Sequence, residues 1–262
     1  MEKVSIIIPA YNEEKRIGNT LEKYGEFFKL LKKQKKLDFE IIIVINNTKD
    51  KTEEVVKTYQ KKYKEIRYLN LKPGGKGFAI IEGFKDALTR KNDLIGFVDA
   101  DNATGPEAYY DLIKNIKNYD GIIASRYAKG SIVTPKQTLL RIIESRIFNL
   151  LVRSVLMIPY RDTQCGAKLF KRKAIELSVS KLKLSKWAFD IDLLYAMNKD
   201  NFRIKEHATN WSDKTGSHVN VVKTGPMMAL AVIRLRILDS IFKGFITFYD
   251  KIVSKLLLGF LK

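Results

Sequence analysis

The sequence predicts an α/β fold in which a mostly parallel sheet is flanked by helices. Five short apolar segments rich in β-branched residues have the length of buried strands, and stretches with helical spacing separate them. Several apolar segments end in polar residues, and ligands bind at this end of the strands in open α/β sheets. At 262 residues the chain can form one such domain with an appendage.

The first predicted strand covers residues 4–8 and ends at Pro9. A helix is expected from there to about residue 33, and a charged helix follows the polar turn at 46–48. A further helix begins at the glycine-rich segment 73–77. The remaining predicted strands are residues 40–45, 66–71, 94–98 and 121–125.

The second half of the chain has long segments that are both apolar and basic. Residues 135–158 and 226–261 have helical spacing interrupted by Arg and Lys, a pattern that suits a membrane interface. Helices packed on the domain, or a dimer contact, would give the same pattern. We therefore expect a catalytic domain at 1–222 and amphipathic, membrane-associated helices at 223–262.

The net charge of +19 indicates an anionic partner: a membrane surface, a phosphorylated substrate or nucleic acid. No RNA-binding signature is visible, so nucleic acid is not the expected partner. No apolar run reaches the ~18 residues of a spanning helix, and no signal peptide precedes the first strand. We expect a peripheral protein on the cytoplasmic face of a membrane. Cys165 is the only cysteine, so no internal disulfide is expected.

Asp99 and Asp101 stand one residue apart directly after a strongly apolar predicted strand. Two carboxylates in this position offer the hard oxygen ligands that Mg²⁺ and Mn²⁺ share with substrate phosphates. Lys76 lies in a glycine-rich helix start that can approach a phosphate closely. This segment is not a P-loop, because the required glycine spacing and the Ser or Thr after the lysine are missing.

These motifs together resemble the inverting family-2 glycosyltransferases with a GT-A fold. The resemblance begins at residues 9–13 and continues through 75–77 and 99–101. The blocks 161–170 and 187–195 narrow it to the dolichyl-phosphate glucosyltransferases, which are related to the dolichyl-phosphate mannose synthases. The resemblance implies a UDP-sugar donor, with glucose or N-acetylglucosamine as candidates, and a dolichyl or polyprenyl phosphate acceptor.

The resemblance also implies donor and metal residues. Asp99 would contact the donor and Mg²⁺ or Mn²⁺, and Asp101 would be the main metal ligand. Asn46 stands where the family usually has an aspartate that contacts the base or ribose, so donor-base recognition is in question. The residues implied beside the nucleoside are Pro9, Tyr11 and Glu13.

The implied acceptor residues are Arg126 and Arg141, which match basic positions facing the acceptor phosphate in the mannose synthases. Asp192, and secondarily Asp190, are the candidate general bases, although acidic residues also favour a helix N-terminus for its dipole alone. Three aromatic residues fit either the core or a sugar pocket: Trp187, Phe189 and Trp211. His218, in the loop 216–218, is a candidate for contact with the diphosphate.

Two other functions stay open at this point. One is transfer to a hydroxyl of a glycan or lipid, which would need a firm general base. The other is a basic protein that binds nucleic acid or membranes without catalysis. No feature of the sequence predicts an oligomeric state.

Overall fold

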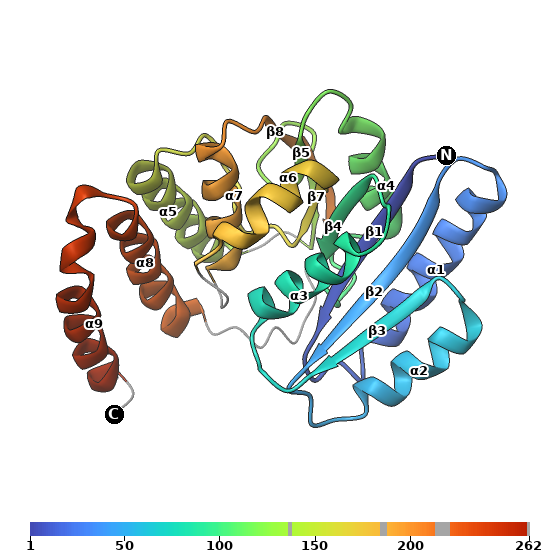
Figure 1. Ribbon diagram of the computed structural model, residues 1–262, viewed down its shortest axis with the longest axis horizontal. Coiled ribbons are helices and arrows are strands. Elements are labelled where there is room, and N and C mark those ends of the chain that lie inside the picture. Colours follow the sequence, from blue (N-terminus) through green and yellow to red (C-terminus); the bar gives the residue numbers. More distant parts are fainter. Residues whose placement is uncertain (136–137, 184–187, 213–220, 261–262) are drawn as a thin grey trace.

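The computed structural model describes residues 1–135, 138–183, 188–212 and 221–260 (Figure 1). The strands are β1 Lys3–Ala10, β2 Asp38–Asn46, β3 Ile66–Leu71, β4 Leu94–Val98, β5 Gly121–Ser125, β6 Ile132–Thr134, β7 Ala167–Lys171, β8 Ile204–Ala208 and β9 Asn210–Ser212. The helices are α1 Ile17–Lys33, α2 Thr52–Lys62, α3 Lys76–Leu88, α4 Pro106–Asn115, α5 Leu139–Leu156, α6 Arg172–Ser178, α7 Phe189–Lys199, α8 Val221–Leu238 and α9 Ile246–Phe260, with short 3₁₀ turns η1 Val179–Lys181 and η2 Ile241–Phe245.

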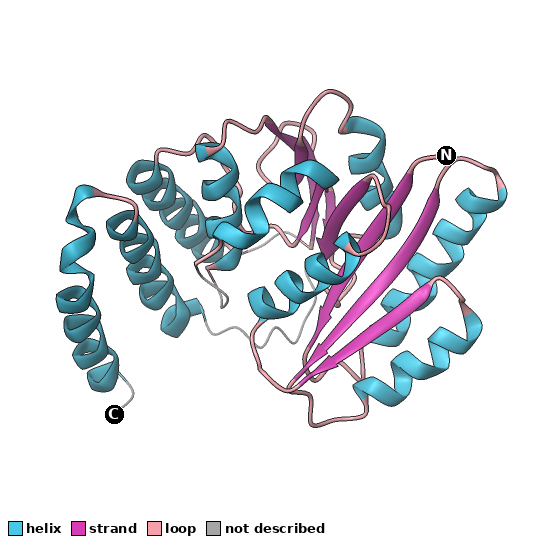
Figure 2. Cartoon of the chain, viewed as in Figure 1, coloured by secondary structure: helices cyan, strands magenta, loops and turns pink. Residues whose placement is uncertain are grey.

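A seven-stranded sheet in the order β3-β2-β1-β4-β7-β5-β8 forms the centre of the molecule. All neighbouring pairs are parallel except the two that involve β7, which runs antiparallel to β4 and to β5. Helices cover both faces of the sheet (Figure 2). The predicted fold class is therefore confirmed.

Each face of the sheet has its own apolar core. Alternate residues of β1 point to opposite faces, so Ile6 belongs to the core under α1 and α4, and Ile7 to the core under α3 and α7. Both side chains have no exposed surface. Strands buried on both faces must be apolar throughout, which explains the uninterrupted Ile and Val runs in the sequence.

The predicted strands agree closely with the structure, and three of them (β3, β4 and β5) have the predicted bounds. β1 continues to Ala10, so Pro9 does not end it. The prediction missed β6, β7, β8 and β9. β6 and β9 have only three residues each. β7 contains a buried lysine that breaks the apolar pattern.

The C-terminal helices do not begin where the sequence indicated. α8 starts at Val221 and contains Pro226, so a boundary after residue 222 falls inside its first turn. Val232 and Leu235 of α8 are fully buried in the core beneath α5 and α7. The division into two units stays a prediction. Among the described residues, every helix is too short or too polar to cross a membrane.

Gly96 provides a test of the close approach between β4 and β7. A Cβ at this position would lie 2.3 Å from the Lys168 carbonyl oxygen and 2.4 Å from the Tyr109 hydroxyl. Because backbone atoms of a central strand have little room to shift, we expect Gly96→Ala to lower the free energy of unfolding by about 3 kcal/mol or more. Denaturant titration measures this. Gly244→Ala is the control, since nothing lies within 4 Å of its added Cβ, and an equal effect of both changes would contradict the packing described.

Candidate active site

The carboxyl ends of three neighbouring strands meet at one edge of the sheet. β1, β2 and β4 are parallel and adjacent in the order β2-β1-β4, so the polar residues that follow them converge. β7 runs in the opposite direction, which brings the segment before it to the same edge. Val98 pairs with Ala167, and the Asp99 amide donates to the Gly166 carbonyl at 3.1 Å. The sequence therefore places residues 99–101 beside residues 162–166.

A chain of alternating charges crosses this edge. Lys76, at the start of α3, lies 2.6 Å from the Asp99 carboxylate and 3.8 Å from that of Asp190. Asp190 is in turn 2.6 Å from the ammonium group of Lys168, which is fully buried. Burial alone would lower the pKa of Lys76, but the charges of Asp99 and Asp190 hold it above its ordinary value. Each charged group in this row thus lies beside a group of opposite sign.

Lys168 is a charged residue of this edge that the sequence analysis missed. Its ammonium group also donates to the Cys165 carbonyl at 2.7 Å and lies 5.3 Å from the centre of the Phe97 ring. A charge is buried only at a large cost unless it is paired, and here Asp190 provides the partner. The signal in the sequence was a lysine inside the apolar strand segment 167–170.

Asp101 belongs to a site that favours a cation. Burial, together with the charge of Asp99, raises the pKa of Asp101. Its Oδ1 atom accepts the Ala103 amide at 2.9 Å. A divalent cation between the two carboxylates would relieve their repulsion, and oxygen donors suit Mg²⁺ and Mn²⁺. Within the described residues no group of three or more His, Cys, Asp and Glu side chains could hold a metal.

The loop that carries the two aspartates is anchored by α1. The Thr20 hydroxyl donates to the Ala100 carbonyl at 2.6 Å, and the Tyr24 hydroxyl donates to the Thr104 carbonyl at 2.8 Å. On the other side, Gly166 leaves room for a carboxylate, because a Cβ there would lie 1.9 Å from Asp99 Oδ2. These contacts hold the backbone of the loop in place.

Arg126 follows β5 and forms a buried ion pair with Asp162. Its Nε and Nη2 atoms donate to the two carboxylate oxygens, each at 2.8 Å, and its own amide donates to Asp162 Oδ2 at the same distance. The guanidinium also lies over the rings of Tyr127 and Trp211, at 5.6 and 5.4 Å. Asp162 uses two of the five N–H donors of the guanidinium. Arg126, which was predicted to face an acceptor, therefore also forms an ion pair within the structure.

The residues predicted to border the nucleoside lie around the ends of β1 and β2. Glu13 pairs with Arg16 at 2.6 Å, and its amide donates to the Thr52 hydroxyl at 2.8 Å. Tyr11 is 45% exposed, Asn46 is buried at the end of β2, and Pro9 is half-buried within β1. The structure thus brings these residues to the same edge of the sheet as Asp99.

The other predicted residues lie further from the charged chain. Asp192, on the first turn of α7, is buried and accepts the Lys183 amide at 2.5 Å. The α7 carboxylate that reaches Lys76 is Asp190. Arg141 is half-buried on the first turn of α5. Trp187 and His218 lie outside the described residues.

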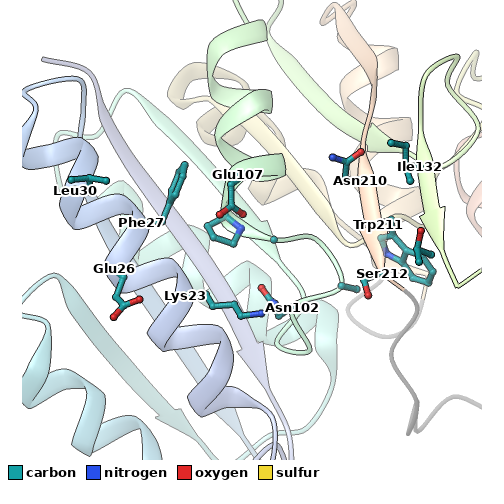
Figure 3. A pocket seen from close by; sticks show the side chains of 14 residues that line it. Lys23, Glu26, Phe27, Leu30, Asn102, Glu107, Ile132, Asn210, Trp211 and Ser212 are labelled. Atoms are coloured by element: carbon teal, nitrogen blue, oxygen red, sulfur yellow. The ribbon is translucent and has the colours of Figure 1, made fainter.

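Trp211 does not belong wholly to the core. It lines a pocket of about 600 Å³ between α1 and β9, beside the aspartate loop. Figure 3 shows Lys23 of α1 pointing towards Asn102, with Trp211 on the opposite wall. The Asn102 Oδ1 atom is buried without a hydrogen-bond partner among the described residues, and water or a ligand in this pocket would satisfy it. Phe189 is a core residue, 1% exposed and packed near Phe84 and Phe97.

The mostly parallel sheet, with Asp99 and Asp101 directly after β4, is the fold of the GT-A glycosyltransferases. The family model "Glycosyl transferase family 2" matches residues 5–177. The chain belongs to this family, as the sequence motifs predicted. Dolichyl-phosphate beta-glucosyltransferase from Dictyostelium discoideum is 33% identical over 89% of this chain and 73% of its own length. The Homo sapiens protein of the same name is 33% identical, with 82% and 69% covered.

Solved structures of more distant proteins share the fold, and a further relative is similar in sequence. Glucosyl-3-phosphoglycerate synthase from Mycobacterium tuberculosis, solved with Mn²⁺, UDP and glucosyl-3-phosphoglycerate, is 17% identical with a TM-score of 0.63, covering 90% of this chain and 79% of its own. TarS from S. aureus, solved with UDP-GlcNAc, is 18% identical with a TM-score of 0.58, covering 97% and 71%. Glycosyltransferase AglD from Haloferax volcanii is 28% identical in sequence over 84% of this chain and 35% of its own length.

The Arg126–Asp162 pair predicts a pH-dependent loss of stability. We expect Asp162→Asn to lower the free energy of unfolding near pH 7 by about 3–5 kcal/mol, because it leaves a buried guanidinium unpaired. Burial would raise the pKa of Asp162, but Arg126 holds it below its ordinary value. The ion pair therefore stabilises the protein fully above the unfolded pKa of about 3.9, and this stabilisation is lost as the pH falls through the folded pKa.

Urea titrations of both proteins across this range test the expectation. The difference between parent and variant should shrink as the pH falls below about 3.9. A difference that stays constant with pH would show that the lost stability does not come from ionised Asp162.

Proposed function

We propose that this chain transfers glucose from UDP-glucose to dolichyl or polyprenyl phosphate with inversion at the anomeric carbon. The product would be a lipid-phosphate-linked sugar, made by a peripheral protein on the cytoplasmic face of a membrane. UDP-N-acetylglucosamine is the second candidate donor. The names of the 33% identical relatives support the glucosyl group and the dolichyl phosphate. UDP in distant proteins of the same fold supports the nucleotide.

The observation that carries the proposal is the charged edge formed by Asp99, Lys76 and Asp190. Such an edge suits a diphosphate. The ammonium group of Lys76 is already held there between two carboxylates, and a bound cation would neutralise the charge of the carboxylates. Asp99 and Asp101 would hold Mg²⁺ or Mn²⁺, which neutralises charge that develops on the leaving UDP. Lys76, which Asp190 helps to keep in place, would bind phosphate oxygens of the donor.

The nucleoside would bind against the ends of β1 and β2. Exposed Tyr11 offers a ring face, and Glu13 is held in position by Arg16. Asn46 keeps hydrogen-bonding capacity without the negative charge of an aspartate. Pro9 completes the wall by fixing the backbone of β1 where the nucleoside would approach.

The acceptor phosphate would bind on the other side of the aspartate loop, towards Arg126 and Arg141. An oxygen of the phosphate forms the new bond to the anomeric carbon, and the bond from that carbon to UDP breaks. A phosphate monoester has a second pKa of about 6, so near neutrality it attacks without losing a proton to the protein. Asp192 is then of secondary importance, whereas a hydroxyl acceptor would require it as general base.

Replacement of Asp101 by Asn should abolish most transfer. We expect a loss on the order of a hundredfold or more, because the charge that binds the cation is removed while the shape is retained. The assay uses polyprenyl phosphate with a panel of nucleotide sugars, and mass spectrometry identifies the lipid product. Chelation of divalent metal should stop the parent enzyme, and added Mn²⁺ or Mg²⁺ should restore it.

Glu54→Gln is the matched control, since Glu54 is exposed on α2 and the change removes the same charge. Full activity of Asp101→Asn would reject the metal assignment. Formation of no lipid product with any donor, together with salt-sensitive RNA binding, would favour the non-enzymatic alternative.

A comparison of Arg126→Lys with Asp192→Asn identifies the acceptor class. With a phosphate acceptor we expect Arg126→Lys to lose about 10- to 100-fold in kcat/KM, because lysine keeps the charge opposite Asp162 but not the bidentate geometry. Asp192→Asn should lose less than about tenfold, since no general base is needed. The two variants are compared by steady-state kinetics after their unfolding curves have been checked.

The reverse result would point to another acceptor. A loss of about 10²- to 10⁴-fold in Asp192→Asn, with Arg126→Lys little affected, is what transfer to a glycan or lipid hydroxyl predicts.

A further inference from the structure

A second basic site lies on α5, apart from the charged edge of the sheet. A cavity of about 270 Å³ is lined by Arg146 and Arg153 of α5 and by Arg161 of the loop that precedes β7, together with Tyr127, Asn149 and Leu150. All three arginines are exposed. Arg146 and Arg153 are seven residues apart, so they lie on the same side of the helix two turns from each other. The cavity therefore has three guanidinium groups and no carboxylate in its lining.

These arginines differ from others in the chain that lie beside carboxylates. Arg126, Arg90 and Arg234 each form an ion pair. In the part of the chain that the structure describes, Arg146, Arg153 and Arg161 form none, and Arg146 lies instead 5.4 Å from the centre of the Tyr127 ring. Three like charges around one cavity repel each other unless an anion joins them. The planar fork of arginine suits phosphate oxygens in particular.

The helix face beside this cavity is apolar and exposed. Helical geometry places a row of large side chains next to the arginines, and Leu150 belongs to both the row and the cavity lining. The row consists of Leu139, Leu140, Ile143, Ile147 and Leu150, whose exposed fractions run from 53% to 78%. An apolar helix face flanked by arginines is typical of helices that lie in a membrane interface.

We propose that the Arg146–Arg153–Arg161 cavity binds the phosphate headgroup of an anionic membrane phospholipid while the apolar row of α5 rests at the acyl boundary. The charge complementarity of the cavity and the net charge of +19 support this occupant. A second copy of the chain is less suited, because a symmetric contact through the row would bring two arginine clusters together. The site lies beside the proposed acceptor site, with Tyr127 between Arg126 and Arg146, and binding of a headgroup there does not require the transfer reaction.

Flotation with vesicles tests the proposal without any sugar donor. The full chain is mixed with vesicles of phosphatidylcholine alone, or with one third phosphatidylglycerol. The parent protein should prefer the anionic vesicles. The triple variant Arg146→Gln/Arg153→Gln/Arg161→Gln should lose about fivefold in partitioning per arginine, on the order of a hundredfold in all, on the anionic vesicles only.

The control removes three charges from the opposite end of the molecule. The three residues are Lys33 of α1, Lys61 of α2 and Lys64, which follows α2. All three are exposed, and α1 and α2 lie away from α5 (Figure 1). Lys33→Gln/Lys61→Gln/Lys64→Gln should keep the preference of the parent. An equal loss in both triple variants would overturn the site, because net charge alone would then explain binding.

A second variant separates the apolar row from the arginines. Leu139→Ser/Ile143→Ser/Ile147→Ser should weaken binding to both vesicle types, whereas the arginine variant should keep the binding of the parent to phosphatidylcholine. Inorganic phosphate at millimolar concentration should not displace the parent protein from anionic vesicles. If it did, the cavity would be a site for soluble phosphate and the proposal would fail.

Turnover on a short-chain, water-soluble polyprenyl phosphate distinguishes this site from the proposed active site. The arginine triple variant should match the parent in this assay, since it keeps Arg126 and Arg141. Loss of that turnover with vesicle binding retained would assign the arginines to the acceptor site and overturn the headgroup proposal. Failure of the transferase proposal would leave the vesicle results unchanged.

Discussion

The antiparallel insertion of β7 between β4 and β5 is the constraint on which the site depends. Had β7 been parallel, the residues before it would lie at the far edge of the sheet. Its reversed direction brings Asp162 to Arg126 and Gly166 to Asp99 at the edge where the parallel strands end. The close approach of β7 to β4 also requires Gly96, whose missing side chain gives room to the backbone of Lys168. One reversed strand therefore determines both the shape and the charge of the edge.

Burial of charged groups at this edge costs free energy, and the alternation of positive and negative charges lowers that cost. Lys168 is fully buried, which is tolerated because Asp190 lies within 2.6 Å. Asp190 also faces Lys76, and Lys76 faces Asp99, so each charge has an opposite neighbour. The outermost member, Asp99, is the most accessible of the carboxylates in this chain of charges. A cation that approaches the edge thus meets a carboxylate that is already paired with Lys76, which in turn faces the buried Asp190.

The sequence predicted the parallel part of the fold well because buried parallel strands leave a strong local pattern. Residues 66–71, 94–98 and 121–125 are apolar segments between polar turns, and the structure has the same bounds. It did not predict β7, because Lys168 interrupts the apolar run and its partner Asp190 lies 22 residues later in the chain. The positions of Asp99 and Lys76 were recognised as a site, but their direct contact depends on how α3 packs against the sheet. Arg126 was expected to face a ligand, and only the tertiary structure shows that Asp162 already binds it.

The arginines of this protein show how one residue type takes two roles. Arg126 is almost buried, with aromatic rings on it and a carboxylate across from it, so its position is fixed before any ligand arrives. Arg146, Arg153 and Arg161 are exposed and share a cavity with no carboxylate, so their charge acts outwards. Tyr127 connects the two groups, since the guanidinium groups of Arg126 and Arg146 lie 5.6 and 5.4 Å from its ring centre. Its hydroxyl donates to Ser145 of α5 at 2.6 Å, which ties the β5 edge to that helix. The surface that would meet a membrane is thereby held at a fixed distance from the edge where transfer would occur.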